Sequence, residues 1–167
     1  LGAIHPEFKV DILINNAGMS TLKSAEDMTV EEFSKIIEVN LTAVFDLSCQ
    51  AVYLGCKRII NVGSISSFGG ARNISAYASS KHGLIGLTKC LSNEWAGRGV
   101  TVNNIAPGFI VTEMLELKDP PTIIGRIPVG RLGTTDDLVG AMMYLASDEA
   151  SYTTGGTVLV DGGWLGR

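Results

Sequence analysis

The residues whose types and spacing most directly allow chemistry are a tyrosine and a lysine in the run Tyr77-Ala-Ser-Ser-Lys81. On a helix, a separation of four positions places a phenol and an ammonium group on the same face, one turn apart. Tyrosine has a pKa near 10, so acid–base work near neutrality needs a shift of roughly 3 units, about 4 kcal/mol. A lysine charge about 5 Å away supplies on the order of 3 kcal/mol at an effective dielectric constant of about 20. A solvated Tyr–Lys pair has the same spacing, so the motif alone does not establish a site.

Four further features could join this pair. Ser64 lies 13 residues before Tyr77 and directly follows an apolar run, where a hydroxyl can reach a crevice. Asn40 lies inside a segment with helical spacing, which is a mildly unfavourable place for asparagine. The sequences Asn15-Asn-Ala-Gly18 and Pro107-Gly108 also follow apolar runs. Taken singly, Asn40 is also explained as a surface or locally bonded amide, and the other three as ordinary turn or loop residues.

The elements that must position these residues alternate between two kinds. Short apolar, β-branched runs suit strands that are covered on both faces, as in a parallel sheet. They are Val10–Ile14, Arg58–Val62, Val100–Ile105 and Thr157–Val160. Strands that alternate with helices predict a parallel α/β sheet, whose ligands bind beyond the carboxyl ends of the strands. Function is therefore expected at residues 15–18, 63–64 and 107–112.

Three helices are predicted between these strands. Thr29 and Glu32 have the spacing of a capping box and start the first helix, whose apolar residues are expected on one broad face. These apolar residues are Phe33, Ile36, Ile37, Leu41, Val44, Phe45 and Leu47. The second helix is predicted over Ser75–Trp95 and ends before a Gly-Arg-Gly sequence. The third begins near Thr134 or Thr135.

Composition restricts the class of protein. The chain has 167 residues, of which 46% are hydrophobic and 18% charged, and its formal net charge is −4. These values fit one folded unit with a substantial core and exclude a disordered chain. No cluster of lysine and arginine points to nucleic acid, and no apolar run approaches the roughly 18 residues that indicate a membrane span. The N-terminal residues show no secretory signal, so a cytoplasmic location is expected.

The sequence predicts no metal site. Its three cysteines, Cys49, Cys56 and Cys90, form no CxxC pair, and both histidines, His5 and His82, lie far from them in the sequence. Reduced thiols in a reducing compartment are the expected state.

Taken together, the motifs resemble the short-chain dehydrogenase/reductase family. The matching elements are NNAG at 15–18, Asn40 within EVNLTAVF, Ser64, Tyr77-x3-Lys81, and PGFIVT at 107–112. The resemblance implies a Rossmann-type doubly wound parallel sheet with three α/β/α layers. It also implies hydride transfer between a small-molecule substrate and NAD or NADP, with NAD slightly favoured.

The resemblance implies roles for four catalytic residues. Tyr77 would act as general acid or base on the reacting oxygen, and Ser64 would bind the substrate carbonyl or hydroxyl. Lys81 would lower the pKa of the tyrosine and hold the ribose of the cofactor. Asn40 would support a water that leads protons to Lys81.

It further implies a cofactor-binding set at the strand ends. Asn16, Ala17 and Gly18 would line the adenosine side. Ile110 and Thr112, in the segment that begins at Pro107-Gly108, would approach the nicotinamide carboxamide. Tyr77 and Lys81 would contact the cofactor as well.

The C-terminal part indicates which members of the family the chain resembles. The segments Arg126–Gly133, Asn93–Ala96 and Val160–Leu165 are similar to bacterial sugar-acid dehydrogenases, namely 2-deoxy-D-gluconate 3-dehydrogenase and gluconate 5-dehydrogenase. The gap of three residues between Tyr77 and Lys81 disfavours the enoyl-reductase branch. A 3-oxoacyl-carrier-protein reductase is the alternative, since its motifs are nearly the same. The family also leads us to expect a homotetramer built partly on the Tyr77 helix.

The chain departs from the family before NNAG. The family opens with a strand and a TGxxxGxG turn that binds pyrophosphate, whereas only 14 residues precede Asn15. On the order of 80 residues, including the one that selects NAD or NADP, are therefore expected outside residues 1–167. We interpret 1–167 as the C-terminal part of a single Rossmann-type dehydrogenase domain. The segment Glu113–Gly125, which would cover substrate, is also short. The other alternative is a non-catalytic remnant that serves only in assembly.

Overall fold

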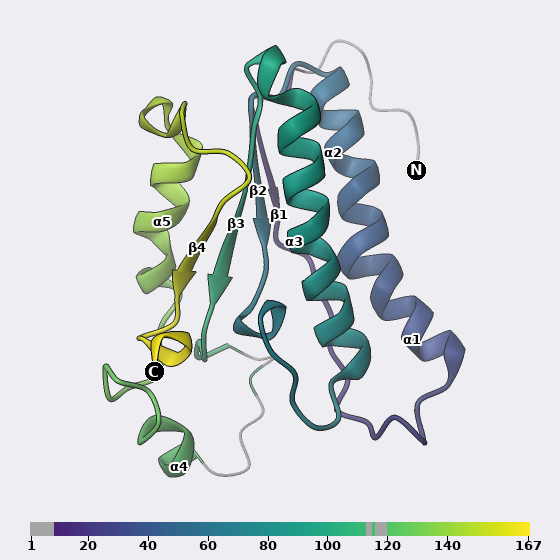
Figure 1. Ribbon diagram of the computed structural model, residues 1–167, viewed down its shortest axis with the longest axis vertical. Coiled ribbons are helices and arrows are strands. Elements are labelled where there is room, and N and C mark those ends of the chain that lie inside the picture. The colour runs from purple at the N-terminus through teal and green to yellow at the C-terminus, as the bar shows by residue number, and fades with distance from the viewer. Residues whose placement is uncertain (1–8, 113–114, 116–119) are drawn as a thin grey trace.

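The computed structural model describes residues 9–112, 115 and 120–167, and its centre is a parallel sheet (Figure 1). The strands β1 (Ile12–Asn15), β2 (Arg58–Val62), β3 (Thr101–Pro107) and β4 (Thr157–Val160) lie in the order β1-β2-β3-β4. All three neighbouring pairs are parallel. The four predicted strands are confirmed, and β2 and β4 have the predicted bounds. Strand β3 runs two residues further than predicted and carries the chain to Pro107 at the edge where the motifs meet.

Helices cover both faces of this sheet and form the outer layers of an α/β/α arrangement (Figure 1). On one face lie α1 (Val30–Ile37), α2 (Ala43–Tyr53) and α3 (Ser75–Trp95). On the other face α5 (Asp136–Ala146) packs against β2, β3 and β4. A short helix, α4 (Pro120–Ile124), lies beyond the carboxyl ends of the strands. The predicted bounds of α3 are confirmed, and the architecture is the predicted Rossmann-type one.

The first helical segment begins with the predicted capping box. The Thr29 hydroxyl accepts a hydrogen bond from the Glu32 amide at 3.2 Å, and the Glu32 carboxylate accepts one from the Thr29 amide at 2.9 Å. Two otherwise unpaired backbone donors are thereby satisfied.

This segment is not one continuous α-helix, because a π-helical turn, Glu38–Thr42, separates α1 from α2. Its buried residues repeat every four positions, as Ile36, Asn40, Val44 and Ser48. In a regular α-helix a four-residue repeat drifts about 40° around the axis at each step. The extra residue of the π turn takes up part of this drift and keeps the buried row facing the sheet and α3.

The prediction that Phe45 and Leu47 lie on the buried face is wrong. Their exposed fractions are 50% and 36%, whereas Val44 is buried. The prediction assumed one broad apolar face, whereas the buried residues form a narrow row of positions four apart that does not include 45 or 47.

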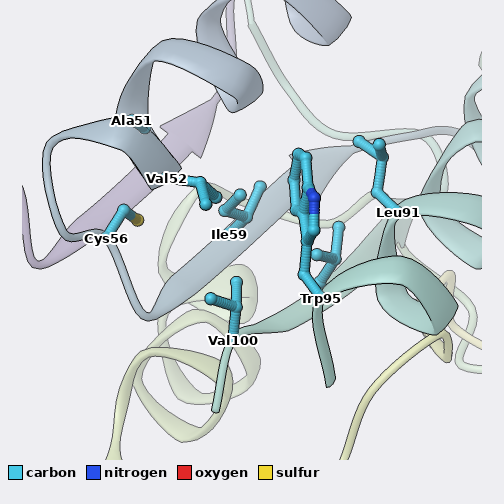
Figure 2. Packing of buried hydrophobic residues seen from close by; sticks show 8 residues of the cluster. Ala51, Val52, Cys56, Ile59, Leu91, Trp95 and Val100 are labelled. Carbon is cyan, nitrogen blue, oxygen red and sulfur yellow. The ribbon is translucent and has the colours of Figure 1, made fainter. Parts of the chain in front are cut away.

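The larger core lies between the sheet and helices α2 and α3. Figure 2 shows Val52 and Ile59 packed toward the ring of Trp95, with Leu91 and Val100 beside it. The cluster also holds Ala51, Cys56 and Val102. A smaller cluster on the opposite face joins Ile60 and Ile105 to Leu145 of α5. Together the two clusters hold the sheet rigidly between the layers.

One face of the edge strand β1 has no such cover among the described residues. Ile12 and Ile14 are 44% and 46% exposed, although Ile60, which is paired in register with Ile14, is fully buried. Helix α5 packs on β2, β3 and β4, and its packing does not extend over β1. Folded proteins usually cover an exposed apolar strip on an edge strand.

Asparagines stand in register on three neighbouring strands. Asn15 of β1, Asn61 of β2 and Asn104 of β3 are cross-strand partners, and all three are buried. Asn15 donates to the Asn61 side-chain oxygen at 2.8 Å, and Asn61 donates to the Thr88 hydroxyl at 2.9 Å. Both amide atoms of Asn104 lack a hydrogen-bond partner among the described residues.

We expect Asn104→Leu to raise the free energy of unfolding by about 1–2 kcal/mol, since a buried amide without partners costs about that much and leucine has a similar volume. The matched change Asn61→Leu breaks two buried hydrogen bonds and should lower stability by about 2 kcal/mol. Urea unfolding of both variants, followed by circular dichroism, checks this pair. Destabilisation by Asn104→Leu as large as that by Asn61→Leu would contradict the expectation.

Candidate active site

The predicted functional segments meet at the carboxyl edge of the sheet, as a parallel sheet requires. A cleft of about 700 Å³ opens there. The predicted residues that line it are Ser64, Tyr77, Gly108, Ile110 and Thr112. Asn40 and Lys81 are buried, with exposed fractions of 1% and 5%.

Ser64 is fixed where β2 leads into a short 3-10 turn, Ile65–Ser67. Its hydroxyl accepts a hydrogen bond from the Ser66 amide at 3.0 Å, and its own amide donates to the Ser67 hydroxyl at 3.2 Å. The Ser64 side chain lies near enough to the Tyr77 phenol to lower its pKa, and both residues line the cleft. The structure therefore brings the predicted serine and tyrosine together.

Tyr77 lies in the first turn of α3, largely enclosed by the cleft. Burial raises the pKa of its phenol above the usual value, and the Ser64 side chain acts in the opposite direction. The net direction is opposite to the lowering expected from Lys81, whose ammonium nitrogen lies 5.6 Å from the centre of the tyrosine ring. Burial thus favours the protonated phenol, whereas a positive charge in the cleft would favour its ionisation.

Lys81 lies one helical turn further along α3, with its side chain directed toward the end of β2. Its ammonium group donates to the Val62 carbonyl at 2.7 Å. Burial lowers the pKa of Lys81 to about 8. An ammonium group has three donors, and one is used among the described residues, so capacity remains for the hydroxyl groups of a ligand.

Asn40 joins three segments from its place in the π-helical turn. Its side-chain oxygen accepts from the Met19 amide at 2.9 Å, and its nitrogen donates to the Met19 carbonyl at 2.9 Å and the Ser80 hydroxyl at 3.0 Å. Gly18 lies against it: a Cβ there would be 3.5 Å from Asn40 Oδ1 and 3.7 Å from Lys81 Nζ. The segment after NNAG is thereby held against the catalytic helix.

The remaining predicted cofactor residues are distributed along the same edge. Asn16 and Ala17 are exposed just beyond β1, and Pro107 ends β3. Ile110 is buried and forms a β-bridge with Gly133.

Gly108 lines the cleft, and packing explains why it is glycine. A Cβ there would lie 2.8 Å from the Asp161 Cα. Any larger residue would push the two backbone segments apart.

Two aromatic residues of the cleft were missed as functional residues by the sequence analysis. Phe109 and Trp164 both line it, with ring centres 4.8 Å apart and planes at 73°. The guanidinium carbons of Arg126 and Arg167 lie 4.9 and 4.4 Å from the Trp164 ring centre. The Asp-Gly-Gly-Trp sequence after β4 was the available signal, but a C-terminal tryptophan is equally typical of packing.

Within the described residues, no helix is long and apolar enough to cross a membrane. No group of three histidine, cysteine or acidic side chains within residues 9–112, 115 and 120–167 could hold a metal ion. Six of the thirteen residues of the predicted covering segment Glu113–Gly125, namely 113–114 and 116–119, lie outside the described residues, and its second part forms α4.

The cleft of this parallel sheet holds a serine and a tyrosine, a buried lysine one helical turn further on and an asparagine behind them. This arrangement is typical of nucleotide-dependent dehydrogenases. A family model described as enoyl-(acyl carrier protein) reductase matches residues 3–165. The chain belongs to the short-chain dehydrogenase/reductase family, as its motifs predicted.

Similar proteins include a sugar-acid dehydrogenase and an acyl-carrier-protein reductase. The chain is 42% identical to a 2-dehydro-3-deoxy-D-gluconate 5-dehydrogenase of Bacillus subtilis, over 95% of this chain and 66% of the relative. It is 46% identical to a 3-oxoacyl-[acyl-carrier-protein] reductase of Salmonella typhimurium, over 96% and 69%. A solved structure of a candidate NAD(P)-dependent gluconate 5-dehydrogenase of Beutenbergia cavernae, with NADP bound, superimposes with a TM-score of 0.93. Its identity is 44%, over 96% of this chain and 68% of that one. The chain thus spans about two thirds of the length of these relatives.

Proposed function

We propose that this protein is an NAD(P)-dependent oxidoreductase that interconverts a secondary alcohol and a ketone on a sugar acid or a related polar substrate. The observation that carries the proposal is that Ser64 and Tyr77 line the same cleft, with buried Lys81 one turn further along α3. Similarity to a 2-dehydro-3-deoxy-D-gluconate 5-dehydrogenase supports the substrate class.

The chemistry of the chain's own residues follows from their geometry. In the reducing direction Tyr77 donates its proton to the substrate oxygen, and its raised pKa keeps that proton in place until the substrate is bound. Ser64 donates a hydrogen bond to the same oxygen and orients the carbonyl. The Lys81 charge stabilises the phenolate that remains, and the Asn40 contacts fix the helix turn that carries it. In the oxidising direction the same groups act in reverse.

The residues present fit the nicotinamide half of a dinucleotide. Lys81 has donors left for ribose hydroxyls, and Gly18 leaves open the space beside Lys81 and Asn40. Ile110 and Thr112 would approach the carboxamide, while Asn16 and Ala17 would line the adenosine side. When bound, the cofactor supplies or accepts the hydride. Resemblance to sugar-acid dehydrogenases slightly favours NAD, and the solved relative was crystallised with NADP.

A panel of initial rates tests the proposal. The full-length protein is assayed with NAD and NADP on D-gluconate and other aldonates, with reduced cofactor on 2-dehydro-3-deoxy-D-gluconate, and with acetoacetyl thioesters. We expect the highest kcat/KM on a sugar acid. A preference for the thioester would establish the alternative, a 3-oxoacyl-carrier-protein reductase, which the similarity to the Salmonella typhimurium enzyme favours. No turnover of any substrate, with no cofactor binding, would leave only a non-catalytic assembly role.

Three further points belong to the proposal. Residues 1–167 would be the C-terminal part of a single Rossmann-type domain, and the uncovered face of β1 at Ile12 and Ile14 supports this. The protein would assemble as a homotetramer partly through α3, and the exposed Phe45 on the neighbouring α2 supports an interface there. We place it in the cytoplasm, as the sequence analysis expects.

A further inference from the structure

The charge of the cleft is unlike the charge of the chain. Acidic residues outnumber lysine and arginine by 17 to 13 over the whole sequence. Yet Arg72 is the one side chain charged at neutral pH among the described residues that line the cleft, and none of them is acidic. The same lining includes Ser64 and Tyr77, so Arg72 shares the cleft with the proposed reacting residues.

Arg72 has no ion pair with another described residue. Two arginines near the cleft have partners within the chain. Arg131 forms an ion pair with Asp137 at 2.8 Å, and the guanidinium of Arg126 lies over the Trp164 ring. Arg58, at the far end of β2, pairs with Asp148 at 3.1 Å. A guanidinium without a carboxylate partner, at the wall of a cleft, keeps its bidentate donor geometry for a ligand.

The backbone beside Arg72 is held in place. Asn73 adopts a left-handed conformation, with φ of 66°, and its carbonyl accepts a hydrogen bond from the Lys23 amide at 2.9 Å. This bond ties the loop before α3 to the segment 20–22, which lines the same cleft. A non-glycine residue in that region of backbone space is uncommon and persists where the surroundings fix it. The loop therefore presents the arginine from a fixed position.

We propose that Arg72 binds the carboxylate of the substrate and so makes this cleft selective for sugar acids over neutral polyols. This rests on the proposed function and deepens it, because Ser64 and Tyr77 hold the reacting oxygen while Arg72 holds the acid group of the same molecule. Arginine binds a carboxylate through charge-assisted, bidentate hydrogen bonds, which are stronger than a neutral hydrogen bond. A lysine at the same position keeps the charge but loses the bidentate geometry, so it should bind the carboxylate more weakly.

The test compares a sugar acid with its neutral amide in the full-length protein. We expect Arg72→Gln to lower kcat/KM for D-gluconate by about 10- to 100-fold, mainly through KM, with Arg72→Lys in between. The rate for D-gluconamide should change less than about threefold, since an amide offers no negative charge. Titration calorimetry of D-gluconate, at saturating oxidised cofactor, should show the same loss in affinity.

Arg98→Gln is the matched control. Arg98 is exposed in the 3-10 turn after α3, about 30 Å along that helix from its first turn. The Arg98→Gln change should leave kcat/KM for both gluconate and gluconamide unchanged. Equal losses for gluconate and gluconamide with Arg72→Gln, or no loss for either, would overturn the role of Arg72 while the activity stands. Absence of sugar-acid turnover by the unmodified protein would instead overturn the proposed function.

Discussion

Tyr77→Phe should lower kcat about 10³-fold while the protein remains folded and still binds its cofactor. The change removes one hydroxyl, the proton donor in the cleft, and general acid–base groups contribute between about 10² and 10⁴ to rate. Phenylalanine retains the ring that packs in the first turn of α3, and Ser64 keeps its hydrogen bond to the Ser66 amide. The measurements are kcat on the best substrate of the panel, thermal unfolding, and cofactor binding by fluorescence.

Tyr152→Phe is the matched control, because Tyr152 is fully exposed in a turn away from the cleft. It should leave the rate and the unfolding temperature unchanged. A Tyr77→Phe enzyme with kcat within a few-fold of the unmodified protein would exclude Tyr77 as the proton donor. A collapse in cofactor binding or in unfolding temperature would show that the ring, and not the proton, is what the site requires.

The sequence predicted the parts of this fold that depend on local patterns. Apolar runs of about five residues located the strands, and the Thr29–Glu32 capping box located the start of α1. The carboxyl ends of parallel strands must share an edge, so the order of strands and motifs predicted that Ser64 and Tyr77 would come together. Both residues line the same cleft, which confirms that juxtaposition.

Other features depend on tertiary packing that a local pattern does not contain. The π turn at Asn40 arises because a row of four-residue repeats must face both the sheet and α3, and nothing in the local residue types announces it. Phe45, predicted on the apolar face, is exposed because the buried row is narrower than that face. Trp164 has the same apolar character whether it fills a core or lines a cleft, so only the three-dimensional course of the chain after β4 distinguishes the two.

The direction of the Tyr77 pKa shows the same limit for electrostatics. The four-residue spacing predicted a positive charge one helical turn from Tyr77, and Lys81 lies there. Burial acts on both groups, however, raising the pKa of the phenol and lowering that of the ammonium. The cost of removing each charge from water depends on how deeply the cleft encloses it, which helical spacing does not specify.

Lys81→Met should abolish activity and at the same time stabilise the protein at pH 7. Burial holds the pKa of Lys81 at about 8, against 10.5 for the free side chain. At 1.36 kcal/mol per unit, a charged Lys81 costs the folded state about 3 kcal/mol below pH 8. Methionine keeps an unbranched apolar stem and carries no charge, so this cost disappears, although the bond to the Val62 carbonyl is lost with it.

The pH dependence of this stabilisation identifies its cause. Between pH 8 and 10.5 the unfolded chain binds a proton at Lys81 that the folded protein does not, so the stability of the unmodified protein gains from this group as pH rises. The methionine variant lacks this gain, and the gap between the two should therefore close across that window. Urea unfolding from pH 7 to 10 measures it, with exposed Lys89→Met on the same helix as the control. A gap that is constant with pH, or a methionine variant that is less stable at pH 7, would show that Lys81 is not a buried charge kept for its chemistry. The expected result is that Lys81 lowers stability in exchange for its proposed role, because that role needs a positive charge where folding disfavours one.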